Sequence, residues 1–296
     1  MNLAIRKWGT LIILSIIWGS SYILIKKGLT GLTPIQLGSL RVIVTTILIA
    51  PIGYQKIKKI PKEKLKWVAF SAFVGSFLPA YLFAFAETEI SSSVTAVMVS
   101  LTPLFTLLIS VIIFGEELLR KQVLGVIVGF LGIIVLINNE LLESSFSLLY
   151  VMFVIIAAFC YAVNANVLKY KLPNIPALGI VFMSFLFMFI PAFIILSFSD
   201  FPFSDFASNP LIIESIIYII ILALFGTAIA KVLYIKLLAI STPVFSVSTT
   251  YLMPIIAIFW GLLDGESFQP IQFIGTLIIL MGVYLVTKKK APKRMP

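Results

Sequence analysis

Lys231 is a basic residue inside a long apolar segment, and its neighbours give it a polar face. Thr227 and Tyr234 precede and follow it by one helical turn, so on a helix all three share one side. An amine in this setting can bind a carboxylate or another anionic group, or lose its proton during a reaction cycle. The alternative is that its flexible stem carries the amine to a polar surface, as that of Lys236 can. We favour the first interpretation, because a charge inside an apolar helix is costly and usually serves a function.

Arg41 is a second cation within an apolar segment, seven residues after Pro34. It can form an anion site or one half of a gate. It can equally be a structural arginine that reaches outward or bonds exposed helix carbonyls. The residue type alone leaves both roles open.

Trp18, Tyr22 and Ser15 share one helical face by their spacing. They can form the wall of a cavity with an aromatic platform, or they can pack one helix against another. Asn164 and Asn166 point to different faces, roughly 200° apart at about 100° per residue. At most one amide can therefore face a cavity, and we expect it to be Asn164, although bonding between helices explains either residue.

The sequence contains little that could perform covalent chemistry. It has no histidine and one cysteine, Cys160, which lies in an apolar segment. It also lacks a metal-binding cluster, a nucleophile–base pair and the glycine-rich motif that binds ATP phosphates. We therefore expect no enzyme activity, no cofactor and no metal site.

The composition indicates that the lipid bilayer is part of this chain's solvent. Sixty per cent of its 296 residues are hydrophobic and only 11% are charged, whereas soluble domains are about a quarter charged. The net charge of +10 does not indicate nucleic-acid binding, because the basic residues form short clusters between apolar segments. A stretch of roughly 20 apolar residues can cross a membrane as a helix. Ten segments qualify: 8–25, 33–54, 67–86, 90–114, 122–138, 146–168, 175–198, 214–238, 243–263 and 270–287.

The loop charges predict how these ten helices cross the membrane. If the N-terminus is cytoplasmic, nearly all of the 22 basic residues lie on the cytoplasmic side, and only Lys26 and Lys27 lie outside. Most of the acidic residues, including Glu87 and Glu266, then lie outside. We expect a multi-pass protein of the cell (plasma or inner) membrane with both termini cytoplasmic. The segment that begins at Trp8 is then a first span and not a cleaved signal peptide.

The two halves of the chain resemble each other. Several pairs of residues differ by 150 positions, and Pro103 and Pro254 correspond with a one-residue gap. Five spans per half place the second half upside down, a common transporter design with substrate bound between the halves. We predict a first repeat at 1–138, an extracytoplasmic linker at 139–146, a second repeat at 147–287 and a basic tail at 288–296. The pairs are Gly115/Gly265, Glu116/Glu266, Gly125/Gly275 and Gly132/Gly282.

These features resemble the EamA family of the drug/metabolite transporter superfamily. The resemblance rests on W-G-S-S-Y at 18–22, the spacing of Pro34 and Arg41, and the twice-repeated proline, Gly-Glu and glycine pattern. It implies an all-α basket of ten helices around a central cavity. It also favours a structural role for Arg41, because the family carries this arginine across different substrates. Lys231 departs from the family pattern, which usually has a small residue there, as at the matching Ala80.

A secondary transporter is therefore the favoured function. We expect an exporter of a small metabolite, such as an amino acid or a related organic compound, with substrate bound by Lys231, Trp18, Tyr22, Asn164 and their neighbours Tyr234, Thr227 and Arg41. The expected partners are this substrate, the bilayer and a coupling proton or ion, but no nucleic acid. The alternatives are a multidrug efflux protein, or a non-transporting scaffold or lipid-handling protein. Substrate identity, transport direction and oligomeric state are open at this point.

Overall fold

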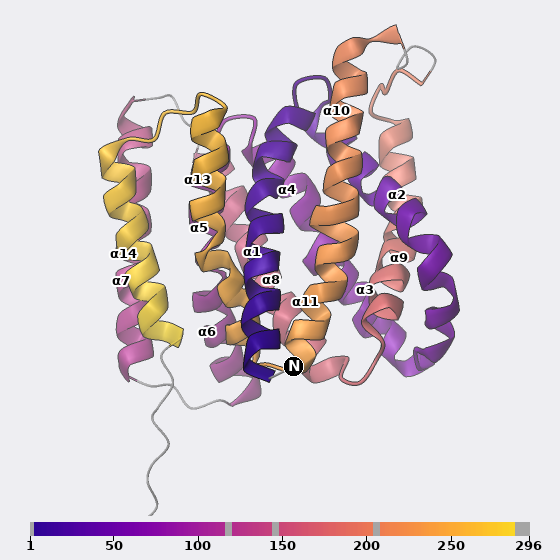
Figure 1. The fold of residues 1–296 in the computed structure, drawn as a ribbon, viewed down its shortest axis with the longest axis horizontal. Coiled ribbons are helices and arrows are strands. Elements are labelled where there is room, and N and C mark those ends of the chain that lie inside the picture. The colour runs from indigo at the N-terminus through magenta and orange to yellow at the C-terminus, as the bar shows by residue number, and fades with distance from the viewer. Residues whose placement is uncertain (1–2, 116–119, 144–147, 204–207, 288–296) are drawn as a thin grey trace, which may run out of the picture.

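The computed structural model describes residues 3–115, 120–143, 148–203 and 208–287, and within these ranges it is a bundle of helices without strands (Figure 1). Eight helical segments in this part of the chain are long and apolar enough to cross a membrane. Four belong to the first half of the chain: α1 (Leu3–Gly28); α2 (Pro34–Gly53) with η1 (Tyr54–Lys59); η2 (Lys62–Lys64), α3 (Leu65–Ala72), η3 (Phe73–Phe77) and α4 (Leu78–Ala86); and α5 (Ser92–Val99) with α6 (Thr102–Phe114).

The second half supplies four more such segments. They are α8 (Leu148–Lys171); α9 (Ala177–Ser197); α10 (Pro210–Ile221), η5 (Leu222–Ile229) and α11 (Ala230–Ala239); and α12 (Pro243–Val247), η6 (Ser248–Tyr251) and α13 (Met253–Leu263). The other two predicted spans are also helical, as α7 (Arg120–Glu143) and α14 (Pro270–Thr287). The all-helical prediction is thus confirmed for the described residues.

Two of the segments contain a π-helix, and each π-helix exposes a glycine carbonyl. In η3, Pro79 has no N–H to donate to the carbonyl of Gly75 one turn earlier. In η5, the N–H of Ala230 bonds to Phe225 and Thr227, so it passes over the carbonyl of Gly226. Such π turns are frequent at functional sites. Both carbonyls are therefore available to side chains from other helices.

Two further segments are interrupted near their middle. The helical run from α5 to α6 breaks at Ser100 and Leu101, just before Pro103, and η6 separates α12 from α13 before Pro254. The interruptions meet, because the Ser100 hydroxyl donates a 2.8 Å hydrogen bond to the carbonyl of Thr250. α6 lies in the lower half of Figure 1 and α13 in the upper half, so α6 and α13 end at opposite ends of the bundle. The glycines after them, Gly115 and Gly265, both have positive φ, of 70° and 82°.

α7 and α14 pack against each other through glycine, at one side of the bundle (Figure 1). A Cβ added to Gly132 would lie 2.7 Å from the backbone nitrogen of Ile279. One added to Gly282 would lie 2.4 Å from the backbone nitrogen of Gly129. The two backbones thus approach each other more closely than any side chain would allow.

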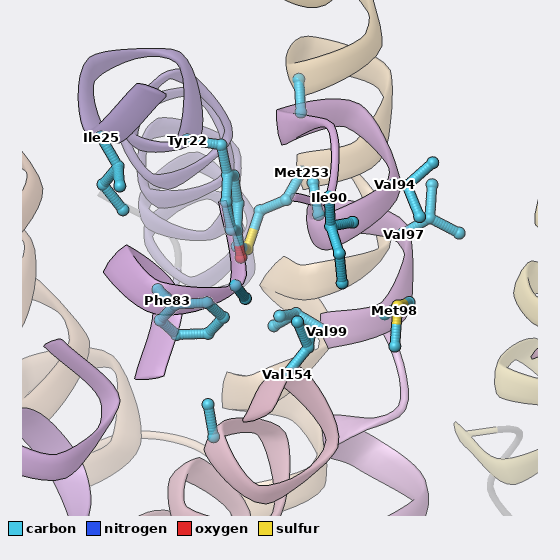
Figure 2. Close-up of a cluster of buried hydrophobic side chains, with 14 of the residues drawn as sticks. Tyr22, Ile25, Phe83, Ile90, Val94, Val97, Met98, Val99, Val154 and Met253 are labelled. Atoms are coloured by element: carbon cyan, nitrogen blue, oxygen red, sulfur yellow. The ribbon is translucent and has the colours of Figure 1, made fainter. Parts of the chain in front are cut away.

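A buried apolar cluster joins helices from both halves and borders the centre of the bundle. Figure 2 shows Tyr22 of α1 directed toward Met253 of α13, with Phe83 of α4 beside it. Val99, at the end of α5, lies close to Val154 of α8 in the same view. This cluster fixes the helices that carry the polar side chains described next.

The charged residues separate to the two ends of the bundle. At one end the Lys169 ammonium donates to the carbonyls of Leu238 and Ser241, at 3.0 and 2.6 Å, and that of Lys64 donates to the carbonyl of Lys171 at 2.9 Å. At the other end Lys26 and Lys27 form ion pairs with acidic residues of the α13–α14 loop. Lys64 and Lys169, which are predicted to be cytoplasmic, therefore lie at the end opposite Lys26 and Lys27, which are predicted to be external.

Candidate functional site: a central cavity

A cavity of about 80 Å³ lies at the centre of the bundle, between helices of both halves. Six of the seven residues proposed from the sequence line it: Trp18, Tyr22, Arg41, Asn164, Lys231 and Tyr234. No Asp or Glu is among its described lining residues. The described lining therefore combines two basic side chains with aromatic, aliphatic and uncharged polar residues.

The side chain of Lys231 extends from α11 to η3, in the other half of the chain. Lys231 is the second residue of α11, and its Nζ donates a 2.5 Å hydrogen bond to the carbonyl of Gly75 in η3. This is the carbonyl that Pro79 leaves free. The side chain is therefore held between helices and does not extend to the end of the bundle, which was the alternative considered above.

Arg41 is 9% exposed, and its Nε donates a 3.0 Å hydrogen bond to the hydroxyl of Thr227. Thr227 in turn donates to the carbonyl of Leu222, five residues earlier. The π-helix explains why Thr227 does not line the cavity beside Lys231 as ordinary helical spacing predicts, because each π turn contains an extra residue. Thr227 instead positions Arg41 at the cavity wall.

The aromatic residues contact one another around the cavity. The Trp18 indole N–H donates a 2.9 Å hydrogen bond to the carbonyl of Gly226, and its ring lies 5.4 Å from that of Tyr234. The Tyr22 ring lies 5.9 Å from Phe83, which lies 5.7 Å from Tyr161. Trp18 therefore has both a packing role and an exposed face in the cavity, so the two interpretations offered by the sequence are not exclusive.

The two asparagines of α8 have different environments. Asn164 lines the cavity and accepts a 2.5 Å hydrogen bond from the Ser71 hydroxyl. Asn166 is buried away from it, where it donates to the carbonyls of Thr106 and Ala162 and accepts from Ser110. The structure thus places toward the cavity the asparagine that we expected there from the sequence.

The close contacts around the cavity involve residues that correspond when the two halves are aligned, Gly75 with Gly226 and Ser21 with Asn164. A Cβ on Gly75 of the first half would lie 2.4 Å from the Asn164 side chain of the second half. One on Gly226 of the second half would lie 2.5 Å from Ser21 Oγ of the first half. Their carbonyls also accept from side chains across the bundle, from Lys231 and Trp18. The two glycines therefore have equivalent surroundings but different hydrogen-bond donors.

Comparison with known proteins gives the family. The sequence profile of the EamA-like transporter family matches residues 7–138 and again 148–288. The chain belongs to the EamA-like transporter family. The earlier resemblance is thereby confirmed, and the family profile occurs twice along the chain.

Curated relatives of this EamA-like chain align over nearly its whole length. It is 25% identical over 287 residues to the "Probable amino-acid metabolite efflux pump" of Escherichia coli (strain K12), covering 95% of this chain and 94% of that protein. It is 27% identical over 290 residues to the "Uncharacterized inner membrane transporter YedA" of the same strain, covering 96% and 91%. A solved crystal structure, 15% identical, superposes with a TM-score of 0.65 over 94% of this chain and 95% of that one, which shows a shared fold.

Sequence reasoning missed several residues of this EamA-like cavity. Phe83, Tyr161 and Thr250 line it but were not among the predicted site residues. Tyr161 had a signal, since it occupies the position of Trp18 when the halves are aligned. Phe83 had none, because an aromatic residue in an apolar helix is ordinary.

A polar cluster closes the end of the bundle opposite the basic loops. Lys26 pairs with Asp264 at 2.8 Å and with Glu266 at 3.0 Å, and Lys27 pairs with Asp264. Glu266 also accepts from the backbone and hydroxyl groups of Ser92 and Ser93, at the first turn of α5. We call these six residues the outer cluster. Glu266 thereby caps the N-terminus of α5, a helix far from it in the sequence.

The ion pairs change the acidity of the outer carboxylates. Burial tends to raise the pKa of Glu266, but hydrogen bonds from Ser93, Ser92 and Lys26 outweigh it and hold this pKa below its ordinary value. Burial also tends to raise the pKa of Asp264, but hydrogen bonds from Lys26 and Lys27 and their positive charges outweigh this effect and lower it below its ordinary value. Both carboxylates are therefore stabilised as anions.

Proposed function

We propose that this protein is a secondary transporter, an exporter, of a small metabolite that carries a carboxylate, such as an amino acid or a related organic acid. The observation that supports this most directly is the central cavity, where Lys231 and Arg41 face an enclosed space without an acidic residue among the described lining. A buried arginine and a partly buried lysine without a carboxylate beside them form an attractive site for an anionic group. The aromatic walls suit the apolar part of such a molecule.

The transport mechanism that we propose is alternating access between two inverted five-helix repeats, over ten spans that include α7 and α14. Reciprocal contacts support it: Gly75 against Asn164 corresponds to Gly226 against Ser21, and Gly132 and Gly282 lie in corresponding places in the α7–α14 contact. A two-fold relation produces such reciprocity, because each surface then contacts its own counterpart. The family profile that occurs twice, with boundaries close to the predicted repeats, supports the same design.

The orientation that we propose places both chain termini in the cytoplasm. The end with Lys64, Lys169 and Lys171 is then cytoplasmic and the outer cluster is external. This agrees with the positive-inside rule, by which loops rich in lysine and arginine lie in the cytoplasm. In this arrangement the outer cluster closes the external end of the central cavity. The relative named as an inner membrane transporter supports placement in the cell membrane.

The metabolite class follows from charge. An amino acid or organic acid brings the carboxylate that Lys231 and Arg41 lack, and one curated relative is named for amino-acid metabolite efflux. A cationic drug would place a further positive charge beside the two that are present. We therefore place multidrug efflux second and a non-transporting role third.

Uptake into proteoliposomes tests this proposal. The purified protein is reconstituted and offered radiolabelled amino acids, organic anions and cationic dyes, with and without a pH gradient. We expect uptake of carboxylate compounds and competition among them, with empty liposomes as the control. Uptake of cationic dyes alone would favour multidrug efflux, and absence of uptake across the panel would favour a non-transporting role.

A further inference from the structure

Glu87 is a buried acid that the cavity and the outer cluster leave without a partner. It follows the last residue of α4 and is only 7% exposed. Neither of its carboxylate oxygens has a hydrogen-bond partner among the described residues. A buried carboxylate in this state is costly when ionised, so the site favours the protonated form.

The position of Glu87 lies between the two functional regions of the molecule. On the cavity side its charge interacts with those of Arg41 and Tyr22, and on the outer side with those of Glu266 and Lys26. α4 packs against α2, η3, α8 and α1. The titratable or charged groups that these elements and the α13–α14 loop direct toward this region are Arg41, Tyr22, Lys26, Tyr161 and Glu266.

We propose that Glu87 is a proton-binding site and that protonation of its carboxylate allows the outer cluster to close. With the outer end closed, the side chain is buried and carries a proton. When the ion pairs of the outer cluster separate, water reaches the carboxylate, which then releases its proton to the external solution. A proton thus binds or leaves as the external end closes or opens.

The pKa of Glu87 determines how pH should affect closure of the outer end. Burial raises the pKa of Glu87 well above its ordinary value, and the charge of Glu266 raises it further, whereas the charges of Arg41 and Lys26 oppose the shift. Because the closed end binds the proton more tightly than the open end does, acid favours closure. Raising the pH through the shifted pKa favours opening. Linkage requires the converse as well, so closure increases proton affinity.

Distance measurements between spin labels test the inference. Thr88 and Ser267 are exposed residues, the first on the α4–α5 loop and the second next to Glu266 on the α13–α14 loop. Labels are attached to cysteines at these two positions in a Cys160→Ser background, and the protein is reconstituted in lipid. We expect the distance distribution to shift toward longer separations as the pH is raised from mildly acidic to mildly alkaline. Glu87→Gln, which is permanently neutral and nearly the same shape, should give the short distances at every pH.

Glu89→Gln is the matched control, because Glu89 is an exposed acid two residues further along the chain. It should keep the wild-type response to pH. Loss of the response in this control, or its persistence in Glu87→Gln, would overturn the assignment, as would a wild-type distribution that does not change with pH. If Glu87→Gln fails to fold, Glu87→Asp provides the test. Its label distances should still change with pH, but with the midpoint of the change at a different pH. Distances that do not change, or that change at the wild-type midpoint, would reject the site.

The physiological role of this site rests on the proposed transport function, but the measured distances require no substrate. A pH response of the labels without transport of any compound in the panel would contradict the proposed function and leave the proton site intact. Transport of carboxylates without a pH response of the labels would support the proposed function and contradict the proton site.

Discussion

A single hydrogen bond accounts for much of the unusual character of Lys231. The amine donates to Gly75, whose carbonyl is available because Pro79 has no N–H. This contact satisfies one of three donor positions on the ammonium, so the rest of its hydrogen-bonding capacity can be directed to a ligand. Desolvation of the charge costs stability, and one neutral acceptor offsets only part of that cost. Because Lys231 costs stability in this position, a role in binding explains it better than a role in supporting the fold.

The Lys231→Ala variant separates these two roles. We expect transport of carboxylate substrates to fall by roughly 30-fold or more, since loss of one partner of a buried charge pair costs about 2–5 kcal/mol. We expect the thermal unfolding midpoint to remain near that of the wild type. Lys236→Ala, which removes an exposed lysine from the same helix, is the control and should transport normally. Full transport by Lys231→Ala would reject the binding role, and failure to fold would indicate a structural one.

Glu266 and Asp264 should differ in how much they stabilise the closed end. Removal of Glu266 leaves two backbone N–H groups of α5 without their acceptor, so Glu266→Ala should lower the free energy of unfolding by about 1–3 kcal/mol. Asp264 makes ion pairs only, nearer the surface, and Asp264→Ala should cost less than about 1 kcal/mol. Denaturation of the detergent-solubilised variants measures both. Equal effects would show that the caps on α5 add nothing.

Stronger acid, below the pH range in which Glu87 takes up its proton, should weaken the outer cluster through Glu266. Its pKa is lowered in the folded state by Ser93, Ser92 and Lys26, against the opposing effect of burial. The stabilisation is therefore complete above the ordinary carboxylate pKa and is lost as the pH falls through the lowered value. Melting curves at a series of acidic pH values should show this loss in the wild type and a smaller one in Glu266→Gln. Identical acid sensitivity in the two proteins would contradict the assignment.

The charged and amide residues of the cavity could be predicted because a polar residue inside an apolar segment is conspicuous. Lys231, Arg41 and Asn164 were identified in this way, and Trp18 by the helical face that it shares with Tyr22. Glu87 was not identified, because a carboxylate at the end of a span looks like a solvated loop residue. Its burial depends on how α1, α2 and α8 pack around it, and no local pattern encodes that.

At the scale of the elements, hydrophobic length predicts where helices occur but not how they deviate from ideal geometry. The eight candidate spans follow the apolar segments closely. The π-helices η3 and η5 could not be predicted, because glycine and proline in a span are equally compatible with a simple kink. The consequence is specific: ordinary spacing places Thr227 beside Lys231, whereas the π turn places it against Arg41.

Contact between α7 and α14 depends on the absence of side chains at their glycines. A Cβ at Gly282 would meet backbone atoms of Gly129 and Gly125, which cannot rotate away. Gly282→Ala should therefore separate the helices and destabilise the protein by about 1–3 kcal/mol. Gly9→Ala is the control, since a Cβ there meets nothing within 4 Å and alanine favours helix. Thermal unfolding measures both, and equal stability of the two variants would show that the close approach is not required.

At the scale of the whole molecule, the two-fold frame that we propose carries an asymmetric site. Gly75 and Gly226 have equivalent carbonyls, which accept from Lys231 and Trp18. When the halves are aligned, Lys231 corresponds to Ala80 and Trp18 to Tyr161. The frame therefore provides two equivalent positions, and the side chains make one cationic and the other aromatic. This is the arrangement expected where inverted repeats move around a single substrate site.

The proposed mechanism also requires that the end with the basic loops be cytoplasmic and that the outer cluster be external. Cys160 is the only native cysteine, so a Cys160→Ser background can carry one new cysteine at a time. Lys59, at the end of η1, belongs to the basic loops, and Glu89 lies in the α4–α5 loop near the outer cluster. The positive-inside rule places Lys59 in the cytoplasm and Glu89 outside. An impermeant thiol reagent applied to intact cells should label the cysteine of Glu89→Cys but label that of Lys59→Cys only after the membrane is permeabilised. Labelling of position 59 in intact cells would reverse the orientation, and with it the direction in which protonation of Glu87 acts.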